Sequence, residues 1–172
     1  MVLSPNLRGA LFMSIATSGF TINDTLIKFV STSTNMGQAM FMRGIFATAL
    51  LLLLAARENV SLRPGMFMQM PLSIRTAGEV GATVTFLLAL FQLPIANVTA
   101  VLQALPLGVT LGAALVFSEP VGWRRWSAII VGFLGVLIIV RPGFEGFSAW
   151  SLSALACVIF CVIRDLATRR IP

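Results

Sequence analysis

Long apolar blocks separated by short polar breaks dominate the chain. Six such blocks occupy residues 9–31, 36–56, 74–93, 98–117, 127–140 and 147–162. A helix needs about 20 mostly apolar residues to cross the hydrocarbon core of a bilayer, so the last two blocks are short and should borrow residues from their flanks. The alternation typical of strands is absent. The pattern predicts an all-α bundle of about six membrane-spanning helices.

A polar stripe runs along the first block. Its spacing of 3, 4, 3, 4 and 3 residues places all its members on one face of a helix. Lipid cannot satisfy polar groups of this kind, so we expect the stripe to face the bundle interior or a water-filled cavity. The members are Ser14, Thr17, Thr21, Asp24, Lys28 and Ser31.

Asp24 and Arg43 lie at matching depths in the first two blocks. At a rise of about 1.5 Å per residue, each lies roughly 4–6 Å from the middle of its helix, towards the outer face. We therefore predict that Arg43, Lys28 or both neutralise Asp24. One interpretation is a structural ion pair that fixes helix register, and the other is a substrate or proton site. Because burial makes a carboxylate hold its proton more tightly, Asp24 is the candidate for proton coupling.

Glu79 is a further charged candidate, near the start of the third block. It follows Arg75 by four residues, so an ion pair within one helix would account for it. The alternative is that Glu79 and Thr83, on the same face, line the cytoplasmic mouth of a cavity. Both interpretations stay open from the sequence.

The fourth block combines a polar face with a predicted kink. Thr99, Gln103, Pro106 and Thr110 follow a spacing of 4, 3 and 4 residues, and 108–112 forms a small-residue motif suited to close helix packing. Pro106 should break one backbone hydrogen bond and bend the helix. Bent helices often line transporter sites, although proline is also common in membrane helices generally.

Composition and charge agree with a membrane protein. The chain is 58% hydrophobic and 10% charged, against about 45–50% and 25% for soluble domains. The net charge of +6 is distributed unevenly. With the N-terminus in the cytoplasm, one side carries most arginines and the other carries Arg141. The cytoplasmic set is Arg8, Arg57, Arg63, Arg75, Arg124, Arg125, Arg164, Arg169 and Arg170.

This asymmetry is the positive-inside pattern of a multi-pass protein, here of the bacterial cytoplasmic membrane, and it argues against nucleic acid as a partner. The chain has no histidine and no Walker A motif, so we expect no enzyme activity, metal or cofactor. The two cysteines, Cys157 and Cys161, lie four residues apart. They are expected to be small buried side chains rather than metal ligands.

Several segments resemble the EamA-type members of the drug/metabolite transporter superfamily. These are SEPVGWRRWSAIIVGFLGVLIIVRPG at 118–143, LPIANVTAVLQALPLGVTLGAALVFSEPVG at 93–122, NDTLIKF in the first block and MRG in the second. The resemblance implies ten helices in two five-helix repeats of opposite orientation, with a substrate cavity between the repeats. It places the first repeat at 1–143 and the first helix of a second repeat at 144–172.

A weak internal sequence similarity agrees with such a repeat. An offset of 141 aligns Asp24 with Asp165 and Lys28 with Arg169. We therefore expect this chain to be part of a longer protein, or else to work as a homo-oligomer that supplies the second repeat.

The function implied is secondary transport of small metabolites or drugs by alternating access. We expect export of an amino acid or metabolite, coupled to protons. The alternative is a non-transporting membrane scaffold or assembly subunit. The residues expected to contact substrate or coupling ion are Thr17, Thr21, Asp24, Arg43, Glu79, Gln103 and Thr110.

Overall fold

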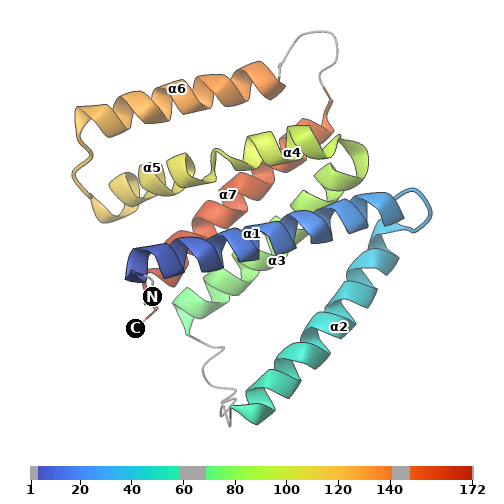
Figure 1. Ribbon diagram of the computed structural model, residues 1–172. Coiled ribbons are helices and arrows are strands. Elements are labelled where there is room, and N and C mark those ends of the chain that lie inside the picture. The colour runs from blue at the N-terminus through green and yellow to red at the C-terminus, as the bar shows by residue number, and fades with distance from the viewer. Residues whose placement is uncertain (1–3, 59–68, 141–147, 172) are drawn as a thin grey trace. The chain divides into compact units, whose positions relative to one another are not determined.

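The computed structural model describes residues 4–58, 69–140 and 148–171. In these ranges the regular structure is helical, which confirms the predicted all-α class (Figure 1). The chain divides into unit 1, Met1–Ala49, and unit 2, Leu50–Pro172. The predicted repeat boundary at 143/144 lies outside the described residues, as do Arg63 and Arg141.

Unit 1 contains α1, Pro5–Val30, and most of α2, Met36–Arg57. The side chain of Ser4 caps α1 by accepting a hydrogen bond from a first-turn amide. Asn35 does the same for α2, where its Oδ1 accepts from the amide of Gly37. These caps explain why the helices begin close to the apolar blocks that the sequence predicts.

Unit 2 contains five helices beyond the end of α2. The predicted fourth block is split between Leu102 and Leu105. The helix breaks here because Pro106 has no N–H to donate to the carbonyl oxygen four residues earlier. The predicted bend at Pro106 is therefore confirmed. The elements are α3 Met70–Gln92, α4 Ile95–Leu102, α5 Leu105–Phe117, α6 Trp123–Val140 and α7 Trp150–Thr168.

The last helix extends into the flank of its apolar block, as expected for a block as short as 147–162. Helix α7 continues to Thr168 and so includes Arg164 and Asp165. These charges read as a polar break in the hydropathy pattern. In the structure they are paired at the end of a helix, so they do not terminate it.

Helix α7 is the centre of unit 2, because it packs against α3, α4 and α5, while α6 packs on α4 and α5 (Figure 1). Glycines allow the close approach. A Cβ placed on Gly108 or Gly112 of α5 would lie 2.8 Å from Val162 or 2.7 Å from Leu166 of α7. The predicted role of 108–112 in close packing is confirmed, with α7 as the partner.

Helix α7 contributes side chains to two buried clusters of unit 2. One gathers small and branched side chains from α3, α4, α6 and α7, together with residues at the helix ends. The other contains Ala82, Cys157 and Cys161, so the prediction that both cysteines are buried is confirmed. Both clusters are modest for a chain of this size, because most large apolar side chains lie outside them.

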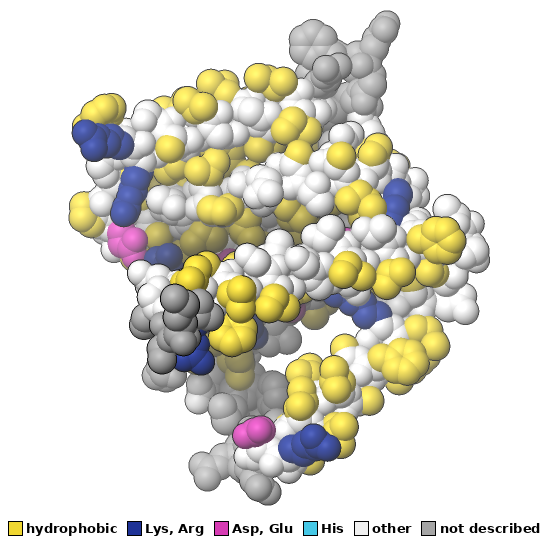
Figure 2. All heavy atoms as spheres, viewed as in Figure 1, with side chains coloured by type: hydrophobic (Ala, Val, Ile, Leu, Met, Phe, Trp, Pro, Cys, Tyr) yellow, Lys and Arg dark blue, Asp and Glu magenta, His cyan; other side chains and the backbone are white. Residues whose placement is uncertain are grey.

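Five described helical segments are long and apolar enough to cross a membrane: α2, α3, the broken segment Ile95–Phe117, α6 and α7. Helix α1 has 26 residues, about 39 Å at 1.5 Å per residue, but its polar stripe lowers its hydropathy and it is not among the five. Figure 2 shows apolar side chains along the surfaces of α1, α2 and α6. This is the surface of a multi-pass membrane protein, whose apolar side chains face lipid or further helices.

Candidate functional site

The hydroxyl groups of the α1 stripe bond to their own helix. Ser14, Thr17 and Thr21 each donate to the carbonyl oxygen four residues earlier, at 2.9, 2.8 and 3.0 Å. The helix itself therefore satisfies the donors of these three hydroxyl groups, so unsatisfied donors alone do not require that they face the bundle interior or water. Their oxygens keep free lone pairs, and all three residues line an open, shallow groove along α1.

The carboxylate of Asp24 cannot bond to the backbone of α1 as the hydroxyl groups do, because it accepts hydrogen bonds and the backbone N–H groups within the helix are already used. Its Oδ1 accepts a hydrogen bond of 3.2 Å from the side-chain amide of Asn23. Arg43 of α2 interacts with it electrostatically, which agrees with the predicted matching depths. Asp24 is partly buried and Arg43 is exposed. The guanidinium of Arg43 therefore lies near the carboxylate of Asp24, and its exposed N–H donors can be reached by a substrate anion.

The polar face of the fourth block lies beside the break between α4 and α5. Gln103 and Thr99 are exposed, while Val98 and Ala104 on the opposite side are buried in the core of unit 2. The hydroxyl of Thr110 donates to the carbonyl oxygen of Pro106 at 2.8 Å. Gln103 thus keeps its amide available, and Thr110 keeps an acceptor.

Glu79 is paired across helices rather than along its own. Its Oε2 lies 3.2 Å from Nη1 of Arg164 in α7. Arg75, which the sequence suggests as its partner, instead donates from Nε to the hydroxyl of Thr168 at 3.1 Å. The structure therefore differs from the predicted pairing within α3. The close approach of α3 and α7 at Gly78 brings the partner from α7 within reach.

Sequence reasoning missed a wider charge network at this end of unit 2. Arg164 also donates from Nε to Asp165 at 2.8 Å, and Arg169 pairs with Glu119 of the α5–α6 turn at 3.1 Å. The internal offset of 141 had singled out Asp165 and Arg169, but the sequence did not indicate Arg164 and Glu119 as their partners.

Removing the charge of Arg164 should weaken the contact between α3 and α7. Arg164→Gln leaves Glu79 and Asp165 without their shared cation, and we expect a melting temperature lower by about 2–4 °C. The effect is limited because all three side chains are partly open to solvent, where an ion pair contributes about 0–1 kcal/mol. Thermal unfolding of the purified protein measures it.

The control for this variant is Arg125→Gln, which removes an exposed arginine at the start of α6. The double variant Arg164→Gln with Glu79→Gln should recover part of the lost stability, because one unpaired carboxylate is then gone. Equal melting temperatures for Arg164→Gln and Arg125→Gln would contradict the structural role of the network.

The predicted site residues fall into three sets. Unit 1 holds Thr17, Thr21, Asp24 and Arg43, and among them Asp24 and Arg43 lie within electrostatic range of one another. Unit 2 holds Gln103 and Thr110 beside the helix break, and Glu79 in the charge network. Among the described residues, no group of three or more histidine, cysteine, aspartate or glutamate side chains is arranged to hold a metal ion.

The chain is similar to several bacterial transporters of known substrate. It is 25% identical to a riboflavin transporter of Vibrio cholerae, over 96% of this chain and 56% of that protein. It is 24% identical to an S-adenosylmethionine uptake transporter of Rickettsia prowazekii, over 92% and 53%. A pseudopaline exporter of Pseudomonas aeruginosa is 27% identical, over 99% and 60%.

The chain thus spans somewhat more than half the length of these relatives. No solved structure matches it significantly. The model of the EamA-like transporter family matches residues 7–141, which include α1 to α6 and the Asp24–Arg43 pair. The relatives are transporters and not enzymes. With its apolar helices, its broken fourth span and this match, the chain belongs to the EamA-like transporter family.

Proposed function

We propose that this chain contributes the first half of a secondary transporter of small metabolites in a bacterial cytoplasmic membrane. The observation that carries the proposal is that Arg43 lies within electrostatic range of Asp24, inside the segment that the family model matches. The substrates of the relatives are chemically diverse: riboflavin, S-adenosylmethionine and pseudopaline. The proposed substrate class is accordingly a small metabolite rather than one compound.

In this proposal the charged pair of unit 1 binds the substrate and the coupling ion. Asp24 takes up and releases a proton, and Arg43 holds a substrate carboxylate or serves as the counter-charge of Asp24. Thr17 and Thr21 offer acceptor oxygens along the α1 groove. These roles need no ATP, because the energy comes from the ion gradient.

Unit 2 contributes neutral hydrogen-bonding groups and the carboxylate of Glu79, which Arg164 holds in place. Gln103, exposed beside the helix break, and Thr110 contact polar groups of the substrate in this proposal. The salt bridge of Glu79 with Arg164 supports a structural role for Glu79. We therefore place Glu79 at the edge of the proposed pathway rather than at the binding site.

A second repeat, from the same protein or from another copy, completes the cavity in this proposal. The internal offset of 141 supports it, because Asn23 donates to Asp24 as Arg164 donates to Asp165. The preceding residue thus binds the carboxylate in both helices. The repeats would have opposite orientation and rock about the site to alternate access.

A flux assay in proteoliposomes tests the proposal. The protein, purified as natively produced, is reconstituted and supplied with riboflavin, S-adenosylmethionine or amino acids, with and without a proton gradient and without ATP. We expect flux of at least one compound above that of empty vesicles, increased by the gradient. The direction that the gradient drives decides between export, as we propose, and uptake. Correctly folded protein without flux for this panel would favour the scaffold alternative.

A further inference from the structure

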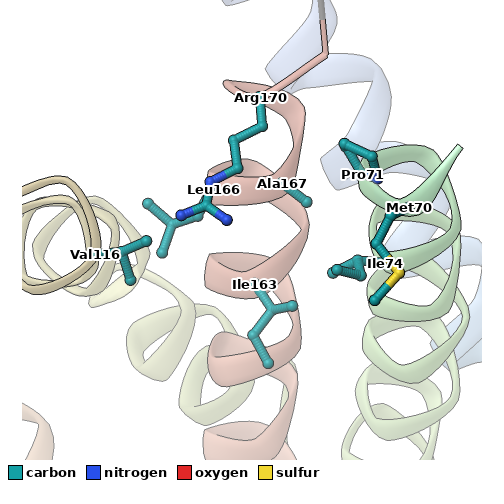
Figure 3. Close-up of a pocket in the computed structure, with 8 residues that line it drawn as sticks. All are labelled: Met70, Pro71, Ile74, Val116, Ile163, Leu166, Ala167 and Arg170. Carbon is teal, nitrogen blue, oxygen red and sulfur yellow. The ribbon is translucent and has the colours of Figure 1, made fainter.

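A hollow of unit 2 differs in chemistry from the proposed substrate site. It lies between α3, α5 and α7 and has a volume of about 240 Å³. In Figure 3, α7 lies between the other two helices, with Val116 and Leu166 facing one another across one side. Every lining residue except Arg170 is apolar. We call this hollow the α3–α5–α7 groove; its lining includes Met70, Ile74, Val116, Ile163, Leu166 and Arg170.

This lining does not suit a polar metabolite. Sites for small molecules place several polar groups around the ligand and occupy about 300–1,000 Å³. The groove is smaller and offers one polar side chain, at one end. An unbranched hydrocarbon chain with a charged end fits that arrangement better, because it needs apolar walls along its length and one polar contact.

The groove lies where three helices end. Met70 is the first residue of α3, Val116 is next to last in α5, and Arg170 follows the end of α7. Helix ends of a membrane protein lie near the level of the lipid headgroups. This end also carries Arg75, Arg164 and Arg169, and the positive-inside pattern assigns it to the cytoplasmic side, whose leaflet contains anionic lipid.

Arg170 is the arginine at this end that is positioned for an external anion. Arg164 and Arg169 are paired with carboxylates, and Arg75 binds Thr168. Within the described part of the chain, Arg170 forms no salt bridge. Its guanidinium instead lies over the ring of Phe117, 5.2 Å from the centroid, which holds it beside the groove with its N–H donors available.

We propose that the α3–α5–α7 groove binds an acyl chain of an anionic phospholipid from the cytoplasmic leaflet, with the lipid phosphate on Arg170. Charge complementarity selects this occupant over a zwitterionic lipid, because Arg170 has no carboxylate partner among the described residues, and the headgroup of an anionic lipid carries no cation of its own to offset the phosphate charge. The proposal concerns lipid recognition and does not depend on the transport role.

Native mass spectrometry of the full chain tests the proposal. The protein is equilibrated in mild detergent with equal amounts of phosphatidylglycerol and phosphatidylcholine that have identical acyl chains. We expect the first retained lipid to be phosphatidylglycerol, with a preference of about five- to tenfold. Arg170→Gln should abolish the preference, whereas Arg125→Gln, at an exposed arginine of the same side, should retain it.

A second variant tests the groove separately from the charge. Ile163→Trp fills the hollow from a side chain that is already 40% exposed, so the fold should survive and lipid retention should fall with Arg170 intact. Circular dichroism verifies the helix content. Equal retention of both lipids, equal losses in Arg170→Gln and Arg125→Gln, or unchanged retention in Ile163→Trp would overturn the proposal. A dimer that Ile163→Trp dissociates, with no lipid bound, would assign the groove to a second copy.

Discussion

Asp24→Asn is expected to lower substrate flux at least tenfold while the protein remains folded. The amide has nearly the same volume as the carboxylate and can still bond to Asn23, so packing is preserved. What is lost is the negative charge opposite Arg43. A hydrogen bond to a charged group contributes about 1.5–3 kcal/mol, which corresponds to about tenfold or more in rate. Residual flux should no longer vary with pH if Asp24 carries the coupled proton.

Thr25→Ala is the matched control for this variant. Thr25 lies one residue along α1, outside the stripe, and its hydroxyl donates to the carbonyl of Thr21 at 2.8 Å. Its removal should leave flux within about twofold, because a back-bonded hydroxyl contributes little. Flux and pH dependence of Asp24→Asn equal to those of the parent protein would show that Asp24 does not couple protons.

Exchanging the two charges separates a structural pair from a transport site. In the double variant Asp24→Arg with Arg43→Asp, the opposite charges remain adjacent, so a pair that only fixes helix register should keep both fold and flux. A site that binds substrate or protons should keep the fold, measured by gel filtration and helix content, and lose flux. Full flux in the folded double variant would refute the site.

Gly78→Val is expected to reduce the stability of unit 2 by roughly 1–3 kcal/mol. A Cβ at this position would lie 3.1 Å from the backbone nitrogen of Arg164 and 3.1 Å from the carbonyl oxygen of Phe160. Backbone atoms cannot turn away as a side chain can, so α3 and α7 must separate. Their separation would also lengthen the bond between Glu79 and Arg164. Denaturation of the purified protein measures the loss.

Gly135→Val is the control, in another apolar helix of the same unit. No heavy atom lies within 4 Å of a Cβ at Gly135, so this variant should change stability by less than about 0.5 kcal/mol. A similar loss for both variants would mean that helix propensity, and not the contact of α3 with α7, determines the cost. An unchanged Gly78→Val protein would contradict the packing of these two helices.

Most helices of this protein follow from local rules. The apolar block at 36–56 predicts α2, Met36–Arg57, almost to the residue, because hydrophobic length and a capping side chain determine where such a helix runs. The bend of the fourth span follows from Pro106 alone. The extension of α7 beyond the block at 147–162 was expected, but its exact end was not, because a hydropathy pattern treats Arg164 and Asp165 as a break.

The candidate site was predictable only in part. The spacing of the α1 stripe and the depth of Arg43 suggested the electrostatic interaction with Asp24 from the sequence. The partner of Glu79 was not predictable, since Arg164 lies 85 residues away in the chain. The local candidate, Arg75, has the right spacing, but it bonds to Thr168 of α7 instead.

The sequence by itself therefore determined an all-α membrane protein, its spans, its bend and its family motifs, because each depends on neighbouring residues and on hydropathy. Tertiary structure decided between small residues that the sequence does not distinguish. Gly132 and Gly135 look alike in the sequence, yet a Cβ on Gly132 would collide with Leu107 while Gly135 has open space. Tertiary structure also decided the charge partners of α7. Both outcomes depend on how closely two helices approach, and that distance is set by side chains far apart in the chain.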